Sequence, residues 1–281
     1  MNNLKFSLLR IYKGLITPVY MIVLMISATL SKYSGNGPIF PKDGFEIEHW
    51  YLANDMQFHL IAPLILIPFA LKKPIIGVII SILILVANIT ASAVIISQNP
   101  GFELGQLGGN PNFFTDAYIV PWFRIGPYIV GLLLGYIIYL KKTSTKPNYI
   151  NPKLNIGLWI FSLFLLCLIV FGNYPNFSGN AMKKWINITY ESTAKIIWSI
   201  ALSYVIFANV TGNGGVINRI LSWKMWKPLA KISFSVYLIH SFVLFQVIST
   251  GLRPIFIQDT IMVYRFLGNL ALSLIAGYLN N

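Results

Sequence analysis

The sequence predicts an all-α, polytopic integral membrane protein. Hydrophobic residues make up 56% of the 281 residues, charged residues make up 10%, and the mean hydropathy is +0.68. Soluble domains carry roughly 25% charged residues, so the main solvent of this chain is lipid. The composition excludes a soluble enzyme, a disordered regulator and a secreted disulfide scaffold, and the single Cys167 cannot form an internal disulfide.

Long apolar segments indicate where the membrane-spanning helices lie in the sequence. A helix of about 20 residues crosses a hydrocarbon core roughly 30 Å thick, whereas a lone strand in lipid leaves its backbone unpaired. Pro63 and Pro68 interrupt the second span, and the fourth, sixth and eighth contain Arg124, Lys195 and Arg265. We predict about eight transmembrane helices: Leu15–Leu30, Asp55–Leu71, Pro74–Ser97, Tyr118–Leu140, Leu154–Asn173, Glu191–Val210, Ile232–Thr250 and Thr260–Leu279.

The charges predict the orientation of these helices. With the N-terminus inside, eight crossings put thirteen of the 21 basic residues in inner segments and all eight acidic residues on the outer half. Lys and Arg are enriched in cytoplasmic loops, so we expect a cytoplasmic N-terminus. The net charge of +13 is then explained by a basic inner face that favours anionic lipids. Because the sequence shows no soluble basic module, we do not expect nucleic-acid binding.

Two glycosylation sequons lie in one predicted outer loop. Asn176 and Asn187 begin the sequences N-F-S and N-I-T and are glycosylation candidates. The sequons at Asn88 and Asn209 lie within or at the end of spans, so these residues should stay unmodified. The sequence contains no P-loop, dinucleotide-binding fingerprint, nucleophile elbow or zinc motif, so we expect no metal site.

Polar residues at membrane depth are costly and are therefore candidates for function. Asp55 and His59 are four residues apart and share a helix face, which could make a base with its orienting partner. The alternatives are an N-cap at Asn54 or Asp55 and a histidine that is simply packed and hydrogen-bonded. Both readings stay open on the sequence alone.

The fourth span contains a second candidate. Arg124 is predicted one turn into this helix, where it could pair with Asp55 or Asp116, or hold an anionic substrate group. Gly126, Gly131 and Gly135 follow it and would allow a neighbouring helix to approach closely.

Two more spans carry ionisable groups. Glu191 and Lys195 are expected in the first turns of the sixth helix as a simple intrahelical pair. His240 is expected at mid-bilayer in the seventh helix, where it either bonds a neighbouring helix or lines a polar cavity.

Five ordered motifs resemble one family. The stretch W-Y-L-A-N-D-M-Q-F at Trp50–Phe58 is similar to a hallmark of the animal nose-resistant-to-fluoxetine-type proteins, which belong to the acyltransferase-3 superfamily. Further stretches match this family in the same order, and the resemblance covers nearly the whole chain. They are Leu15–Leu24, Pro121–Tyr136, Gly212–Trp223 and Pro228–His240.

The resemblance implies a ten-helix acyltransferase domain, to which we assign residues 1–281. It also implies transfer of an acyl group, other than an amino-acyl group, from a thioester such as acyl-CoA to a hydroxyl of a lipid or carbohydrate. The partners would be membrane lipids, the acyl donor and the acceptor. The residues expected to line the cavity between the helices are Asp55, His59, Arg124, Tyr128 and His240.

The chain also departs from the family pattern. The histidine considered catalytic in the superfamily lies on its first membrane helix, and the chain is expected to lack the first two family helices. The R-x-x-R motif is degraded, because Leu15 stands where its second arginine is expected before Pro18. The catalytic residue is therefore not identified, and the chain could be an inactive, truncated form. The alternative function is a non-enzymatic transporter of lipids or hydrophobic drugs.

Overall fold

The computed structural model describes residues 50–108, 110, 112–144, 150–180, 182–233, 235–237 and 259–279. It divides the chain into two compact units, residues 50–222 and residues 1–49 with 223–281. The expected span Leu15–Leu30, most of the expected span Ile232–Thr250 and the candidate His240 lie outside the described residues.

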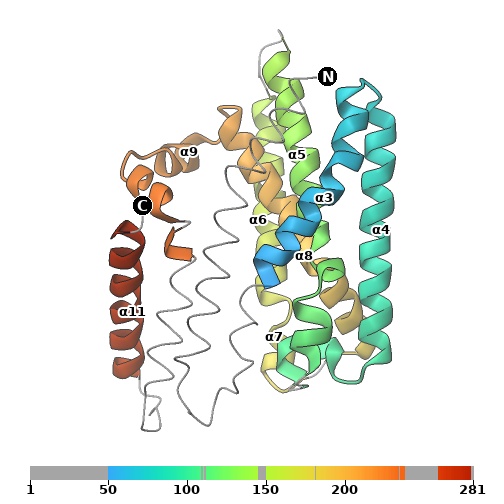
Figure 1. The fold of residues 1–281 in the computed structure, drawn as a ribbon, viewed down its shortest axis with the longest axis vertical. Helices are drawn as coiled ribbons and strands as arrows, with labels where there is room; N and C mark the ends of the chain where they lie inside the picture. The colour runs from blue at the N-terminus through green and yellow to red at the C-terminus, as the bar shows by residue number, and fades with distance from the viewer. Residues whose placement is uncertain are drawn as a thin grey trace. The chain divides into compact units, whose positions relative to one another are not determined.

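Long helices build the unit of residues 50–222. They run alternately up and down, so that α3, α5 and α8 point one way and α4 and α6 the other (Figure 1). Helix α8 contacts α4, α5 and α6, and α4 also contacts α3 and α5. The helices are α3 (Trp50–Ala70), α4 (Pro74–Gln98), α5 (Ile125–Thr143), α6 (Pro152–Phe171) and α8 (Lys184–Val210).

The described residues contain helices and no strand, which confirms the all-α class. Five of their helices are long and apolar enough to cross a membrane, namely α4, α5, α6 with its extension to Phe177, α8 and α11 (Asp259–Leu279). Helix α3 is apolar over a shorter stretch, Gln57–Ala70. The chain is therefore an integral membrane protein, and the predicted total of eight spans stays a prediction.

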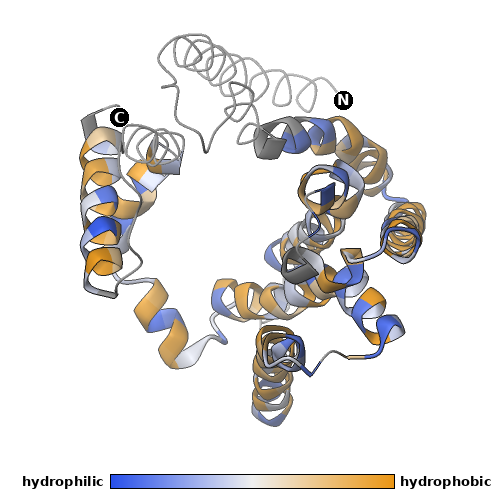
Figure 2. Cartoon of the chain, turned by 90° about the horizontal axis from the view of Figure 1, so that it is seen from below, coloured by the Kyte–Doolittle hydropathy of each residue, from blue (hydrophilic) through white to orange (hydrophobic). Residues whose placement is uncertain are grey.

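Apolar side chains cover the outside of these helices. Ile75 and Leu83 of α4 are 73% and 63% exposed, and Phe164 of α6 is 58% exposed. In Figure 2, which views the molecule from below, hydrophobic residues colour much of the surface of these helices. Exposing such an apolar surface to water is unfavourable, whereas contact with the acyl chains of a bilayer is not.

Short helical segments gather at one end of this unit, which we call the η end (Figure 1). They are η3 (Phe102–Gly108), η4 (Phe114–Tyr118), η5 (Pro121–Phe123) and α7 (Tyr174–Phe177). The opposite end, which we call the basic end, carries the α3–α4 turn, the end of α5, the start of α6 and α9 (Gly215–Leu221).

The acidic side chains of this unit and a group of basic side chains lie toward opposite ends. Asp55, Glu103, Asp116 and Glu191 all lie in the half toward the η end. The termini of the helices at the basic end carry no acidic residue among the described positions. They hold Lys72, Lys73, Lys141, Lys142, Lys153 and Arg219.

Two predicted helix starts are wrong. The fourth span begins at Ile125 rather than Tyr118, because Pro121 lacks a backbone N–H and holds Val120 extended at ψ 142°. Helix α8 begins at Lys184 rather than Glu191, since the intervening polar side chains are satisfied: Asn187 accepts from Asn176, and Thr189 donates to the carbonyl oxygen of Trp185 in its own helix. Glu191 therefore lies two turns inside the helix.

The second unit is described by α11 and by helical residues 226–233 and 235–237. Gly277 of α11 lies directly against Val236, where a side chain would not fit. This contact allows the close approach that small residues give to helices in lipid.

Candidate functional site

The segment Tyr118–Arg124 between η4 and α5 is held by amide side chains of two other helices. Asn54 of α3 is 5% exposed and donates through Nδ2 to the carbonyl oxygen of Ile119 at 2.6 Å. Asn88 of α4 is 4% exposed and donates through Nδ2 to the carbonyl oxygen of Trp122. Backbone groups freed by the break before α5 are thereby satisfied inside the bundle, as a low-dielectric environment requires.

Helix α5 starts in close contact with α4 and α8. A Cβ atom on Gly126 would lie 2.6 Å from Cγ1 of Ile196 and 2.7 Å from Oδ1 of Asn88. The predicted close approach is thus found at Gly126. It is wrong for Gly131 and Gly135, where an added Cβ would have no described atom within 4 Å.

Asp55, His59 and Tyr128 form one cluster, which we call the histidine cluster. His59 donates from Nδ1 to the carbonyl oxygen of Asp55 at 2.8 Å, and Oδ2 of Asp55 lies 3.6 Å from the same nitrogen. The ring of Tyr128 on α5 is centred 5.7 Å from the imidazole. The shared helix face predicted for Asp55 and His59 is present, whereas an N-cap role is wrong because α3 begins at Trp50.

The hydrogen bond of His59 determines its chemistry. A carbonyl oxygen only accepts, so Nδ1 carries the hydrogen, and in the neutral ring Nε2 holds the lone pair. The side chains of His59 and Asp55 are 37% and 45% exposed, so they are open to a reactant. A fixed imidazole beside a carboxylate is suited to taking up and returning a proton.

Arg124 occupies a different place from the one predicted. It is the residue before α5 rather than part of its second turn, and its Nε donates to the carbonyl oxygen of Tyr118 at 2.7 Å. Its guanidinium carbon lies 4.0 Å from the centre of the Tyr118 ring, a cation–π contact. Neither Asp55, which bonds His59, nor Asp116, which accepts a hydrogen bond from Thr115, forms an ion pair with Arg124.

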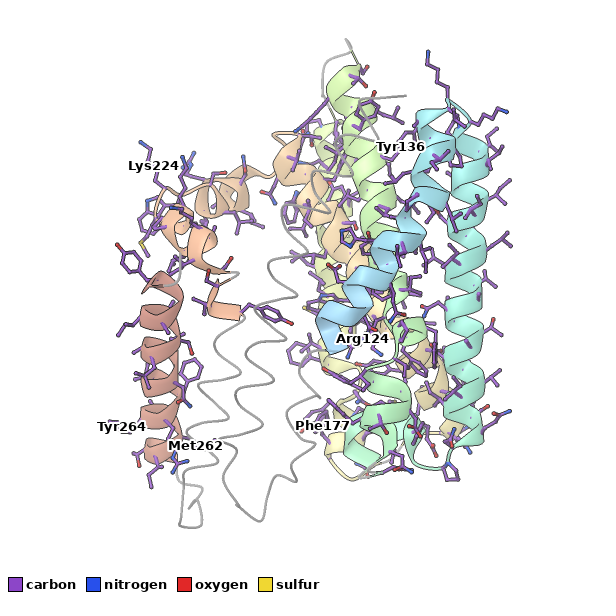
Figure 3. The ribbon with its side chains drawn as sticks, in the orientation of Figure 1. Arg124, Tyr136, Phe177, Lys224, Met262 and Tyr264 are labelled. Atoms are coloured by element: carbon purple, nitrogen blue, oxygen red, sulfur yellow. The ribbon has the colours of Figure 1, made fainter. Side chains whose placement is uncertain are left out.

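A pocket of about 490 Å³ lies between α5 and α8, with one wall from α6, and we call it the basic pocket. Figure 3 shows Arg124 at the start of α5, where the pocket has its polar end. Sequence reasoning missed Lys195 as a second cation of this site. The lining residues are Arg124, Pro127, Gly131, Leu134, Ile169, Ala194, Lys195, Trp198, Ser199, Leu202, Ser203 and Ile206.

The predicted intrahelical pair of Glu191 and Lys195 is wrong. No direct ion pair joins these side chains, both of which are described. The carboxylate of Glu191 lies over Gly105 of η3, where Oε1 is 2.6 Å from the position of an added Cβ. Nζ of Lys195 instead lies 5.4 Å from the centre of the buried Phe123 ring, on the side of α8 that faces α5.

The two glycosylation candidates contact each other. Nδ2 of Asn176 donates to Oδ1 of Asn187 at 2.9 Å, and Asn187 is 2% exposed within α8. Its Nδ2 donates to the carbonyl oxygen of Met182. A glycan on Asn187 does not fit this packing, because the modified nitrogen is enclosed by protein. Glycosylation at Asn176 stays a prediction.

Two known proteins are similar to this chain over most of its length. The chain is 31% identical over 267 residues to nose resistant to fluoxetine protein 6 of Caenorhabditis elegans, covering 82% of this chain and 32% of that protein. It is 23% identical over 214 residues to regulator of hypoxia-inducible factor 1 of the same organism, covering 68% of this chain and 39% of that protein. The chain thus spans about a third to two fifths of these relatives.

No solved structure matches the chain. The sequence profile of the acyltransferase-3 family, described as an acyltransferase domain, matches residues 4–279. With nearly every residue inside that match, the chain belongs to the acyltransferase-3 family of membrane proteins.

Proposed function

We propose that this membrane domain transfers an acyl group from a thioester, such as acyl-CoA, to a hydroxyl of a lipid or carbohydrate. The observation that carries the proposal is the histidine cluster, found in a chain of the acyltransferase-3 family. A hydroxyl becomes a competent nucleophile when a base removes its proton as it attacks. His59, with Nδ1 held by Asp55, presents Nε2 for that task.

The transfer needs one proton to move twice. Nε2 of His59 takes the proton of the acceptor hydroxyl while the acceptor oxygen attacks the thioester carbonyl carbon. The tetrahedral intermediate collapses, its carbon–sulfur bond breaks, and the imidazolium returns the proton to the leaving thiolate. Asp55, whose Oδ2 lies 3.6 Å from Nδ1, stabilises the imidazolium that forms between the two transfers.

The charge distribution indicates from which side of the membrane each substrate approaches. The basic end carries lysines at the start or end of α4, α5 and α6, and the N-terminus shares this side in the proposed topology with a cytoplasmic N-terminus. Acyl-CoA carries phosphates, so a basic cytoplasmic face favours its approach. The histidine cluster lies in the other half of α3, toward the η end, where an extracytoplasmic or lipid acceptor would be met.

Labelled acyl-CoA tests the proposal. The full chain, purified into lipid nanodiscs, is expected to release free CoA thiol and to place the labelled acyl group on a hydroxyl-bearing lipid or sugar in equal amounts. Thiol release without an acylated acceptor would mean hydrolysis and would contradict the proposal. Flux of a lipid or hydrophobic drug across proteoliposomes, with no thiol released under any condition, would favour the transporter.

A further inference from the structure

A short part of the second unit combines lysines with exposed apolar side chains. We call residues 223–233 the Trp–Lys segment. The backbone amide of Trp226 donates to the carbonyl oxygen of Trp223 at 3.1 Å, and this turn leads into helical residues 226–233. Helical spacing therefore describes the side chains from Trp223 onward. Every residue from there to Lys231 is exposed.

The three lysines of the segment form one stripe along its helix. Lys224, Lys227 and Lys231 are spaced by three and four residues, which at about 100° per residue places them within about 60° of the helix circumference. Figure 3 shows the side chain of Lys224 extending away from the ribbon. Every other residue from Trp223 to Ile232 is apolar, so the basic stripe is narrow and sharply bounded.

The described residues supply no counterion to this stripe. None of the three lysines has an ion pair with a described carboxylate. The sequence contains no acidic residue between Glu191 and Asp259, so the segment has no acidic neighbour along the chain either. Like charges on one helix face repel each other, and anions from outside the chain would turn this repulsion into attraction.

The apolar side chains of the segment restrict what the partner can be. Trp223 and Trp226 are 59% and 42% exposed, and Met225 and Leu229 are exposed beside them. Tryptophan is enriched at the membrane–water interface, where a lysine can extend its ammonium group toward the water. A soluble polyanion would satisfy the lysines and leave the tryptophans without apolar contact, whereas the surface of an anionic bilayer satisfies both.

We propose that the Trp–Lys segment binds the headgroups of anionic phospholipids through Lys224, Lys227 and Lys231. The cytoplasmic leaflet carries such lipids, and juxtamembrane clusters of lysine attract them. In the proposed topology the segment follows the sixth span and lies on that side of the membrane. The proposal goes beyond a basic inner face in general, because it assigns the lipid to one stripe of three lysines. It requires binding and no acyl transfer.

The experiment measures binding of radiolabelled phosphatidylserine to the purified full chain in a neutral detergent, with no acyl donor present. The triple variant Lys224→Gln, Lys227→Gln and Lys231→Gln is expected to weaken binding at least tenfold. Arginine at the same three positions keeps the charges and is expected to leave binding within threefold of the unmodified protein. Melting temperatures show whether each variant is folded. Unchanged binding to the glutamine variant would overturn the proposal.

A matched control removes the same number of charges elsewhere. Lys72, Lys73 and Lys142 are exposed lysines of the basic end, and no tryptophan adjoins them in the sequence. The triple variant Lys72→Gln, Lys73→Gln and Lys142→Gln is expected to bind phosphatidylserine within threefold of the unmodified protein. Equal losses in the two triple variants would show that only the total positive charge matters, which would overturn the assignment to this segment.

The unmodified protein tests the nature of the ligand. Phosphatidylcholine, which carries no net charge, is expected to compete at least tenfold more weakly than unlabelled phosphatidylserine, and about 0.5 M salt is expected to weaken binding by screening. Equal competition by phosphatidylcholine would contradict recognition of the negative charge. Free CoA is a soluble polyphosphate, and displacement of the lipid by CoA at a lower concentration than by phosphatidylserine would assign the stripe to a soluble phosphate instead. These outcomes do not depend on whether the chain transfers acyl groups.

Discussion

Asn88, in the middle of α4, donates its side-chain amide to the carbonyl oxygen of Trp122, 34 residues further along the chain. The contact joins a helix without a charged residue to the segment that precedes α5. It explains why a polar side chain is retained where the surrounding sequence is apolar. A free amide at that depth would be costly, whereas a paired one fixes the position of the segment that carries Arg124.

Asn88→Leu is expected to lower the free energy of unfolding by about 1–3 kcal/mol. The substitution removes the donor and leaves the carbonyl oxygen of Trp122 without this bond inside the bundle. Thermal unfolding of the purified protein measures the loss. Ser97→Ala is the control, because Ser97 is exposed and bonds only the carbonyl oxygen of Val94 in its own helix. An equal effect of both substitutions would contradict the structural role of Asn88.

Gly126→Ala is expected to destabilise the protein by about 1–3 kcal/mol through overpacking. Its new methyl group would lie 2.6 Å from Ile196 and 2.7 Å from Asn88, both in the protein interior. Gly135→Ala on the same helix meets open space and is expected to be neutral or stabilising by up to about 1 kcal/mol. Melting temperatures of the two variants decide the point, and the opposite ranking would show that α4, α5 and α8 do not meet at Gly126.

Gly105→Ala is expected to destabilise the η end more than Gly179→Ala. Both glycines have positive φ, 58° and 82°, so alanine at either position is strained by about 1–3 kcal/mol. An added Cβ at Gly105 also meets the carboxylate of Glu191 at 2.6 Å, whereas none is met at Gly179. Glu191→Ala removes this contact, so the difference between their unfolding temperatures should become smaller in a Glu191→Ala background.

How far the sequence predicts the structure depends on the kind of information needed. The bounds of α4 and α6 follow from hydropathy because Pro74 and Pro152 stand at their first positions and polar residues flank them. The Asp55–His59 face follows from helical spacing. Both properties are local, so one segment suffices to predict them.

Contacts between distant segments could not be predicted in this way. Lys195 follows Glu191 at the spacing of an ion pair, yet η3 brings Gly105 to the carboxylate and turns it away from the lysine. Tyr128 lies beside His59 because α5 packs against α3, which no periodicity in either helix specifies. The basic pocket therefore became visible only in three dimensions. One signal for it was present in the sequence, namely a lysine within an apolar span.

The proposed topology predicts which residues are accessible from each side. In sealed microsomes with the cytoplasmic face outward, Lys73→Cys in a Cys167→Ser background should react with an impermeant maleimide. Thr115→Cys, at the η end, should react only after detergent is added. Both positions are exposed in the structure, so burial does not limit the reaction. Labelling of Thr115→Cys in sealed vesicles would reverse the orientation and place the basic end outside.

Acyl transfer by the His59→Gln variant tests the central claim most directly. Glutamine removes the titratable nitrogen, so the rate of labelled product formation by the full chain is expected to fall by about a hundredfold or more. Gln57→Ala, an exposed change on the same helix, is the control and should leave the rate within about threefold. A rate for His59→Gln within about threefold of the unmodified protein would show that the histidine cluster is not the proton-transfer group.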